Sequence, residues 1–247
     1  MSCLAVITYH SLDDSGSVIS VDPSAFRRHV GWLADRGFRA FRLSDGLAHL
    51  RAGTLPERAV ALTFDDGFLN TVAVALPILS ARGFQATVFP VTDYLDGSND
   101  WPTQPPGVPR LPLMGWSGLQ ELCASGWEIG AHTRTHCDLT RLASAEVRAE
   151  VVGSKEALEQ RLGAAVLGFA YPYGRYGVRD RAIIGETYSA AVATRLGLVG
   201  WSSDPLALER VDAYYLTRPD LARLLGSPLL SPYLILRQMI RRLRGVS

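Results

Sequence analysis

The sequence predicts an α/β fold, a single-domain distorted (β/α) barrel with seven or eight parallel strands. Short apolar runs alternate with amphipathic segments, and polar motifs follow the ends of several of these runs. The length of 247 residues is close to the roughly 250 typical of such barrels. With 47% hydrophobic residues, the chain can bury a substantial core. We therefore treat residues 1–247 as one barrel domain.

The order of elements follows from apolar runs and helix signals. Asp22-Pro23 provides an N-cap and a first-turn proline for a helix over Ser24–Arg36, which ends at Gly37. The other expected helices are Ser44–Leu50, Thr71–Ala81, Ser117–Ala124, Ser144–Leu162 and Arg179–Glu186. The expected strands are Leu4–Tyr9, Phe38–Phe41, Ala59–Phe64, Ala86–Val91, Trp127–Ala131, Val166–Ala170, Ser189–Ala193 and Asp212–Leu216.

Two segments interrupt this alternation. The stretch at about 96–115 is rich in proline, so we expect an inserted loop that forms a lid or a binding rim. Residues 232–244, PYLILRQMIRRLR, predict a basic C-terminal amphipathic helix. Such a helix could lie on an anionic membrane surface, but a helix packed on the barrel with solvated arginines is the more common case.

Charge and cysteine content narrow the function classes. The net charge of +1 gives no case for a nucleic-acid partner. The three cysteines show no C-x-x-C spacing, and their odd number argues against a disulfide framework and for a reducing compartment. Neither a signal-peptide pattern nor an apolar run near 20 residues is present. We expect a cytoplasmic protein, with membrane association through the C-terminal helix as an option.

Two polar motifs suggest a metal site. Asp65-Asp66-Gly67 follows a buried strand, and two adjacent carboxylates resist joint ionisation unless a positive group lies beside them. His132 and His136 are four residues apart and can face one side of a helical turn. Each motif alone also fits a strand-ending turn or a pair of surface residues. Together, two imidazoles and one carboxylate form a three-ligand site with open positions.

Three motifs follow one another along the chain, namely Thr63-Phe64-Asp65-Asp66-Gly67, His132-Thr133-Arg134-Thr135-His136 and Tyr171-Pro172-Tyr173-Gly174. In this order they resemble the polysaccharide deacetylase (NodB-homology) family. The resemblance spans roughly residues 4–212. It implies a deacetylase barrel whose polar motifs meet at the rim formed by the carboxyl ends of the strands.

The resemblance also implies a role for each motif. Asp66, His132 and His136 would be the ligands of one divalent metal ion. Asp65 would be the general base that takes a proton from water. The backbone N–H of Tyr173 would help to stabilise the oxyanion of a tetrahedral intermediate.

The chain departs from the family at the general acid. The usual acid is a late histidine in a Leu-x-His motif, but no histidine follows His136. His10 ends the first strand, which neighbours the last strand in a closed barrel. Tyr9-His10 also resembles the circularly permuted branch of the family, which includes poly-N-acetylglucosamine deacetylases. We assign His10 as general acid; the alternative is a strand-end histidine bonded to the backbone.

A second departure concerns the partner of the base. Ala170 stands where the family has an arginine that orients the catalytic aspartate. Arg210 is a candidate replacement, although a solvated arginine is the more common case. The weaker substrate-binding candidates are Trp116, Pro172, Trp201 and Arg210, the two tryptophans being chosen because they fall in predicted rim loops.

The expected activity is metal-dependent hydrolysis that removes an N-acetyl group from an amino sugar or glycoconjugate. One alternative is an amidohydrolase or deformylase acting on an acylated small molecule. Another is a non-catalytic sugar-binding protein, against which an open metal site argues. Zinc is the first expectation for the metal, although iron, cobalt, nickel and manganese suit the same donors.

Overall fold

The computed structural model describes residues 3–216 and 223–243. The strands are β1 (Ala5–Tyr9), β2 (Arg39–Phe41), β3 (Ala59–Asp66), β4 (Thr87–Pro90), β5 (Glu128–Ile129), β6 (Gly168–Ala170), β7 (Ala190–Leu196) and β8 (Leu208–Asp212). The α-helices are α1 (Pro23–Asp35), α2 (Leu43–Arg51), α3 (Leu76–Ser80), α4 (Trp116–Ala124), α5 (Ser144–Leu162), α6 (Val178–Thr187) and α8 (Leu230–Leu243). A π-helical turn, η1 (Thr71–Ala75), precedes α3, and the four 3₁₀ turns are Thr92–Tyr94, Leu139–Arg141, Pro172–Gly174 and Ala213–Leu216.

Seven parallel strands form a nearly closed barrel in the order β5-β4-β3-β1-β8-β7-β6. β2 is an additional parallel strand that pairs with the beginning of β3. The seam closes just after β5, where the Ala131 N–H donates to the Gly168 carbonyl at 3.0 Å and the Ala170 N–H donates to the Ala131 carbonyl at 2.9 Å. The predicted α/β barrel is therefore confirmed. β1 lies between β3 and β8, as expected for neighbouring first and last strands.

The alternation of side chains along β3 divides the core into two parts. Val60, Leu62 and Phe64 belong to the cluster between the barrel and its outer helices. Ala59 and Ala61 belong to a second cluster inside the barrel. Because successive strand residues point to opposite faces, Thr63 and Asp65 continue the inward row toward the carboxyl end of the strand. The interior is apolar at one end and polar at the other.

Helix α2 covers the amino-terminal end of the barrel. Its buried Leu43, Leu47 and Leu50 belong to the same cluster as the inward-facing Val6 and Val192. The Leu43 N–H donates to Thr87 Oγ1 on β4 at 2.9 Å, which fixes the start of the helix on the barrel. The opposite, carboxyl-terminal end of the barrel is therefore the end available for a site.

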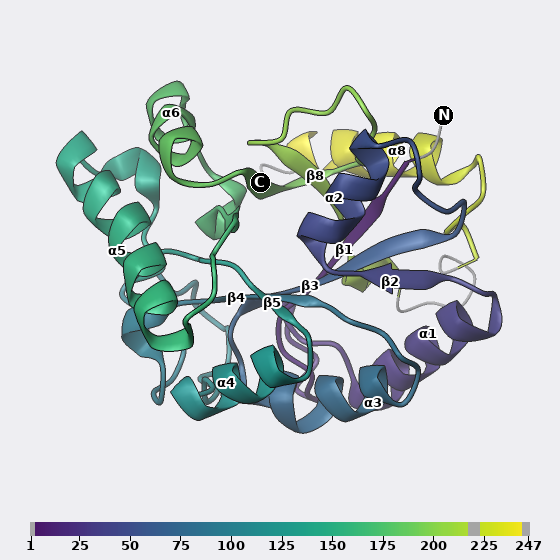
Figure 1. The fold of residues 1–247 in the computed structure, drawn as a ribbon, viewed down its shortest axis with the longest axis horizontal. Coiled ribbons are helices and arrows are strands. Elements are labelled where there is room, and N and C mark those ends of the chain that lie inside the picture. Colours follow the sequence, from purple (N-terminus) through teal and green to yellow (C-terminus); the bar gives the residue numbers. More distant parts are fainter. Residues whose placement is uncertain (1–2, 217–222, 244–247) are drawn as a thin grey trace.

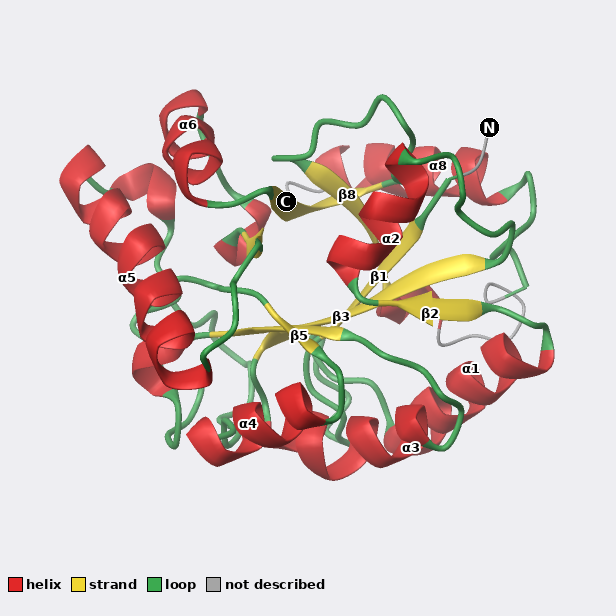
Figure 2. Cartoon of the chain, in the orientation of Figure 1, coloured by secondary structure: helices red, strands yellow, loops and turns green. Residues whose placement is uncertain are grey.

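The remaining helices surround the strands. Helices α1, α3, α4, α5 and α6 follow one another around the outside of the sheet (Figure 1). Loops, drawn in green in Figure 2, connect the strands to these helices. α8 (Leu230–Leu243) lies against β7 rather than extending the βα alternation. Among the described residues, no helix combines the length and apolar character needed to cross a bilayer.

The structure corrects the predicted last strand. The expected strand Asp212–Leu216 is a 3₁₀ turn from Ala213 onward, and β8 lies earlier, at Leu208–Asp212. Its sequence, LERVD, has three charged residues among five and does not resemble a buried strand. Arg210 nevertheless faces the barrel interior, because a buried carboxylate meets it there. The predicted C-terminal helix is present over 230–243, and position 244 lies outside the described residues.

Candidate metal centre and catalytic pocket

The predicted metal ligands meet at the carboxyl-terminal end of the barrel. Asp66 ends β3, while His132 and His136 lie in the segment that follows β5. The Nε2 atoms of His132 and His136 lie 3.4 and 3.3 Å from Asp66 Oδ1. One potential ligand atom from each of the three buried residues lies within 4.8 Å of the others. The spacing suits three donors around one cation.

The second ring nitrogen of each histidine fixes its orientation. His132 Nδ1 is 2.8 Å from the Ala170 carbonyl, which can only accept, so Nδ1 carries the proton. His136 Nδ1 is 2.9 Å from the Tyr173 hydroxyl, which in turn donates to the Thr103 carbonyl at 2.9 Å. Nδ1 of His136 is therefore also the donor. Both imidazoles direct Nε2 toward Asp66, with hydrogen bonds that set the tautomer of a metal ligand.

The chemistry of these donors fits a cation. If both imidazoles are neutral and protonated on Nδ1, each Nε2 directs a lone pair toward the Asp66 carboxylate. Two nitrogen acceptors and one carboxylate oxygen then face one another with no proton between them. Asp66 Oδ1 is buried and has no hydrogen-bond donor. Burial alone would lower the pKa of His132, but Asp66 and Asp65 raise it above the usual value of 6.5. Burial lowers the pKa of His136 below its usual value, which keeps that imidazole neutral at pH 7. The ionised carboxylate and the converging imidazole nitrogens therefore suit a metal ion.

Asp65 is held by a buried ion pair with Arg210. The guanidinium donates to both oxygens of the carboxylate, Nη1 to Oδ1 at 2.8 Å and Nη2 to Oδ2 at 2.6 Å. Its Nε donates to the Ala193 carbonyl at 2.9 Å. Both side chains are almost fully buried. The bidentate contact fixes the plane of the carboxylate, the geometry for which arginine is better suited than lysine.

The electrostatics of Asp65 follow from these contacts. Burial would raise the pKa of its carboxyl, but the charge and hydrogen bonds of Arg210 outweigh burial and hold the pKa below the usual 3.8. The carboxylate is therefore ionised at neutral pH. His10, at the end of β1, places Nε2 3.8 Å from Asp65 Oδ2. The expected proximity of His10 to the base is confirmed, and the alternative of a solvated Arg210 is wrong.

The backbone at the site is unusual. Among the described residues, five that are not glycine have a positive φ, namely Asp66, Asp96, Thr133, His136 and Tyr173. Four of these five belong to the two motifs that carry the ligands or to the Tyr171–Gly174 turn. Left-handed backbone is disfavoured for residues with a Cβ and is retained where a site requires it. At Gly174, with φ of 67°, a Cβ would lie 2.0 Å from Thr194 Oγ1, so only glycine fits the turn.

A cavity of about 400 Å³ opens over the cluster. Its floor contains Asp65, Asp66 and the two ligand histidines. Its walls come from residues 16–19 and 104–108, together with His10, Trp101, Tyr171, Tyr173 and Thr194. The proline-rich loop therefore lies at the site, as predicted for a lid or rim. The volume falls within the range of about 300–1,000 Å³ typical of pockets for small ligands.

Trp101 is the aromatic residue that the sequence reasoning missed. Its ring stacks on His136 with centroids 4.2 Å apart, and its buried Nε1 has no hydrogen-bond acceptor among the described residues. The available signal was its position inside the predicted loop at 96–115. Trp116 and Trp201 were chosen instead, and the structure places neither in the pocket.

None of the four weaker substrate-binding candidates lines the cavity. Trp116 begins α4, packs against the outer core and stacks under the Arg161 guanidinium. Trp201 is 74% exposed on the loop between β7 and β8. Arg210 is buried beneath Asp65, so it positions the carboxylate rather than contacting a substrate. Pro172 is buried in the 3₁₀ turn beside Tyr173 and does not line the cavity.

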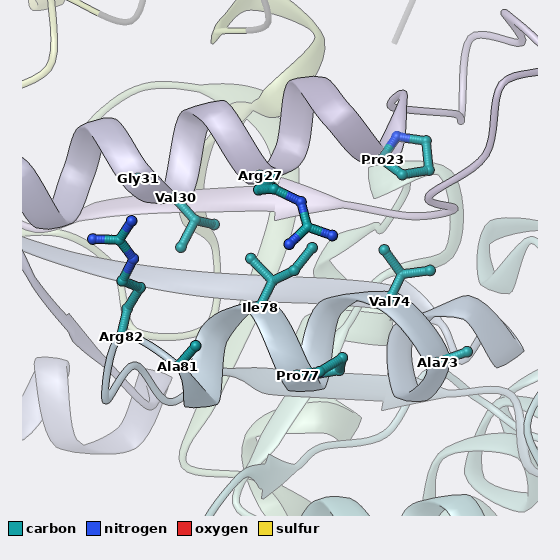
Figure 3. Close-up of a pocket in the computed structure, with 10 residues that line it drawn as sticks. All are labelled: Pro23, Arg27, Val30, Gly31, Ala73, Val74, Pro77, Ile78, Ala81 and Arg82. Carbon is teal, nitrogen blue, oxygen red and sulfur yellow. The ribbon is translucent and has the colours of Figure 1, made fainter.

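A second cavity, of about 450 Å³, carries no comparable chemistry. It lies between α1 and α3, and Figure 3 shows apolar side chains such as Val30, Val74 and Ile78 between the two helices, with Arg27 and Arg82 beside them. The described residues that line it include no carboxylate, histidine, cysteine or hydroxyl. The polar pocket at the barrel end is therefore the candidate active site.

Comparison with known proteins agrees with the motifs and the site. The family described as polysaccharide deacetylase matches residues 52–189, which include both metal-site motifs and the Tyr171–Gly174 turn. The chain belongs to the polysaccharide deacetylase family. Its membership identifies it as a deacetylase, and the buried Asp66, His132 and His136 cluster is a site that can hold the metal on which this family depends.

Three proteins with partial sequence identity to this chain carry names that refer to deacetylases or to N-deacetylases. YxkH of Bacillus subtilis is 26% identical over 210 residues, 84% of this chain and 70% of YxkH. A poly-beta-1,6-N-acetyl-D-glucosamine N-deacetylase of Escherichia coli is 31% identical over 134 residues, which cover 51% of this chain and 20% of that protein. The Staphylococcus aureus protein of the same name is 25% identical over 164 residues, 63% of this chain and 54% of that protein. The chain thus spans only part of these two N-deacetylases.

Solved structures share the barrel. The deacetylase PplD of Streptococcus pyogenes superposes with a TM-score of 0.76 at 22% identity, covering 96% of this chain and 98% of PplD. IcaB from Ammonifex degensii gives a TM-score of 0.75 at 21% identity, covering 92% of this chain and 97% of IcaB. The fold of this deacetylase is therefore that of the family across almost its whole length.

Proposed function

We propose that this chain is a metal-dependent hydrolase that removes the N-acetyl group from an amino sugar or glycoconjugate. The observation that carries the proposal is the arrangement of one pocket. A three-donor cluster, an ionised carboxylate held by a buried arginine, and a histidine beside that carboxylate all line or underlie one cavity. Relatives named as N-deacetylases of a poly-N-acetylglucosamine support the substrate class.

Asp66, His132 and His136 would hold the metal. A divalent ion bound there would lower the pKa of water toward about 7 and polarise an amide carbonyl. We propose zinc, because two imidazoles and a carboxylate with open positions are a common catalytic zinc set. The same donors accept iron, cobalt, nickel or manganese, so metal analysis has to decide the identity.

Asp65 would act as the general base. Its carboxylate is ionised because Arg210 holds its pKa low, and its plane is fixed by two hydrogen bonds. A base with a low pKa is a weak proton acceptor, so the attacking water must have a pKa well below that of bulk water. Arg210 is thus a positioning residue, and it takes the place of the family arginine that is absent at Ala170.

His10 would donate a proton to the departing amine. It lines the cavity and lies on the same side as Asp65, at 3.8 Å, from which a bound amide could be reached. The backbone N–H of Tyr173 would donate to the developing oxyanion from the opposite wall. An amide nitrogen leaves poorly unless it is protonated, so loss of His10 is expected to slow the bond-breaking step.

A second candidate reaction has one specific observation in its favour. The outer part of the cavity is apolar, with Ile19, Pro105, Pro106 and Val108 among its lining residues. Such a wall suits an apolar group and favours amide hydrolysis on an acylated small molecule that is not a sugar. The same metal cluster, base and acid would serve both reactions.

We propose a cytoplasmic location, supported by three cysteines that form no disulfide, with peripheral contact to a membrane, supported by the basic amphipathic sequence of the C-terminal helix. A substrate held at the cytoplasmic face of a membrane, such as a lipid-linked amino sugar, would meet both conditions. Fractionation of cells expressing the tagged full chain tests the location. Recovery of the protein solely outside the cell would reject it.

A substrate panel tests the reaction. N-acetylglucosamine oligomers, N-formyl amines and N-acyl amino acids would be incubated with metal-loaded protein, and the released acid and amine measured. We expect acetate from the amino sugars. Asp65→Asn should reduce kcat about a thousandfold, within the 10²–10⁴ range of general base catalysis, while retaining the metal. Turnover confined to the non-sugar amides would select the second reaction, and full activity of Asp65→Asn would reject the base.

A further inference from the structure

The C-terminal helix α8 presents an apolar face to solvent. Ile235 is 61% exposed, Leu236 56%, Met239 57% and Leu243 87%. Positions 236, 239 and 243 follow one another at helical spacing, so they form one stripe along the helix. Exposed apolar residues scattered singly need no explanation, but a contiguous stripe indicates a surface that contacts something else.

The opposite face of α8 binds the barrel partly through polar groups. The Arg237 guanidinium lies over the Tyr215 ring, 4.6 Å from its centroid. The Leu196 N–H donates to Gln238 Oε1 at 2.9 Å, and Arg241 Nη1 donates to the Thr194 carbonyl at 3.4 Å. The expectation that these arginines point to solvent is therefore wrong. The inward face buries Leu230 and Leu234. It also contains Arg237 and Arg241, whereas Leu236, Met239 and Leu243 face water, so apolar residues lie on both faces of this helix.

A loop across a cavity from α8 carries another exposed apolar residue. A cavity of about 460 Å³ separates α8 from the loop after β7, with Ile235 and Met239 on one side and Gly200 and Ser202 on the other. Trp201 lies between these two loop residues and is 74% exposed. Exposed tryptophan is typical of the boundary between lipid and water, where its ring is apolar and its N–H is wet.

The charge of the C-terminal segment indicates the partner. Residues 223–247 contain five arginines, at positions 223, 237, 241, 242 and 244, and no aspartate or glutamate. This segment therefore carries a formal charge of +5, whereas the whole chain carries +1. Two copies meeting through this face would bring two such segments together, which like-charge repulsion opposes. Arg237 and Arg241 contact the barrel, but their charge still adds to the net positive charge of the segment. An anionic surface with an apolar interior suits both this net charge and the exposed apolar residues.

We propose that α8 and Trp201 form a surface that docks on an anionic lipid bilayer. Ile235, Leu236, Met239, Leu243 and Trp201 enter the boundary between headgroups and acyl chains. The basic segment supplies the attraction to anionic headgroups. Docking is peripheral and reversible, because a few apolar side chains supply the binding energy.

Vesicle sedimentation tests the proposal. The full chain would be mixed with sucrose-loaded vesicles of phosphatidylcholine containing 30% phosphatidylglycerol, and with vesicles of phosphatidylcholine alone. We expect the protein to pellet with the anionic vesicles and much less with the neutral ones. Binding should weaken as sodium chloride rises from 0.05 to 0.5 M, because salt screens the attraction.

Two variants separate this surface from general adhesion. Leu236→Glu combined with Met239→Glu should weaken binding to the vesicles at least tenfold. Each of the two apolar side chains contributes to the binding free energy by moving from water into the bilayer. Val178→Glu, on α6, is the matched control, because Val178 is an apolar residue with 91% exposure far along the chain from α8. It should bind as the wild type does. Circular dichroism would confirm that both variants remain folded.

Three results would overturn the proposal. They are wild-type protein that stays in the supernatant with anionic vesicles, a double variant that binds as well as the wild type, and a wild-type dimer in light scattering that the double variant abolishes. The last would make this face an interface between copies. The assay uses no substrate, so its failure leaves the proposed deacetylation untouched, and failure of that activity leaves docking untouched.

Discussion

Proteins usually bury apolar residues and expose charged ones, and two regions of this molecule depart from that rule. The pocket at the barrel end buries charged residues, and the outer face of α8 exposes apolar ones. In the pocket, charged groups are buried, and Asp65 survives there because Arg210 meets both of its oxygens. On the outer face of α8, four apolar side chains are exposed, while Arg237 and Arg241 contact the barrel. Burying a charge requires a partner within the molecule, whereas a contiguous exposed apolar face indicates a partner outside it. The pocket therefore carries its compensation in its own structure, while the helix calls for a partner outside it.

Breaking the compensation in the pocket should have the largest effect. Arg210→Leu leaves the buried Asp65 carboxylate without its partner, and we expect the free energy of unfolding to fall by about 3–5 kcal/mol. Urea denaturation followed by fluorescence measures the change. Asp65→Leu combined with Arg210→Leu removes both charges and should recover most of the loss. If the free energy of unfolding of Arg210→Leu lies within about 1 kcal/mol of the wild-type value, the ion pair between Arg210 and Asp65 is not needed for stability.

A subtler change in the pocket concerns the orientation of a ligand. Tyr173→Phe removes the hydroxyl that contacts His136 Nδ1 and keeps the ring. We expect metal affinity or kcat/KM to fall about 10–100-fold, as for other groups that orient metal ligands. Competition with a chelating dye measures the affinity. Tyr176→Phe, whose ring stacks on Tyr171, is the matched control and should change neither value. Equal affinities in the two variants would show that the Tyr173 hydroxyl does not orient His136.

A buried histidine outside the pocket offers a third comparison. His29 on α1 is bonded to the Tyr9 hydroxyl, and burial lowers its pKa from 6.5 to about 4. Between these values the unfolded chain binds the proton and the folded chain does not, so stability is lost as pH falls from 6.5 toward 4.

We therefore expect the wild type to lose about 2 kcal/mol of His29-dependent stability between pH 7 and pH 5, at about 1.36 kcal/mol per pKa unit. His29→Gln does not titrate and should show a correspondingly smaller loss. Urea denaturation of both proteins at the two pH values measures the difference. Parallel losses in the two proteins would mean that His29 does not remain neutral in the folded state.

The exposed face of α8 should give the smallest effect on stability. Leu236→Glu and Met239→Glu each remove an apolar group from water rather than from a core, so the free energy of unfolding should change by less than about 0.5 kcal/mol per site. Leu234→Ala on the inward face should cost about 2–5 kcal/mol. Thermal and urea denaturation compare them. A large cost at Leu236 would show that this face supports the fold.

Much of the site could be predicted because each motif follows a strand. Asp65 and Asp66 end an apolar run, and a barrel brings the carboxyl ends of its strands to one rim. The place of His10 followed from the same rule, since β1 lies beside β3 and β8. Long-range proximity was thus contained in the order of the elements.

The missed features depend on which way a side chain points. LERVD does not resemble a buried strand, because it contains the charged Arg210. An arginine can be buried inside the barrel only where it pairs with a carboxylate, here that of Asp65. The amphipathic period of α8 defines two faces, but it does not say which of them the barrel covers. The place of Trp101 in the pocket depends on the fold of the proline-rich loop, which stacks its ring on His136. In each case a tertiary partner, absent from the local sequence, decides the outcome.

Metal analysis of purified protein tests the central claim most directly. Inductively coupled plasma mass spectrometry would be applied to the wild type, Asp66→Ala and Asp65→Asn, each loaded with the same metal and freed of excess. We predict about one divalent ion per chain in the wild type and in Asp65→Asn, and a large loss in Asp66→Ala, because Asp66 supplies a ligand and Asp65 does not. A wild type that retains no metal, or an Asp66→Ala variant that retains as much, would contradict the account.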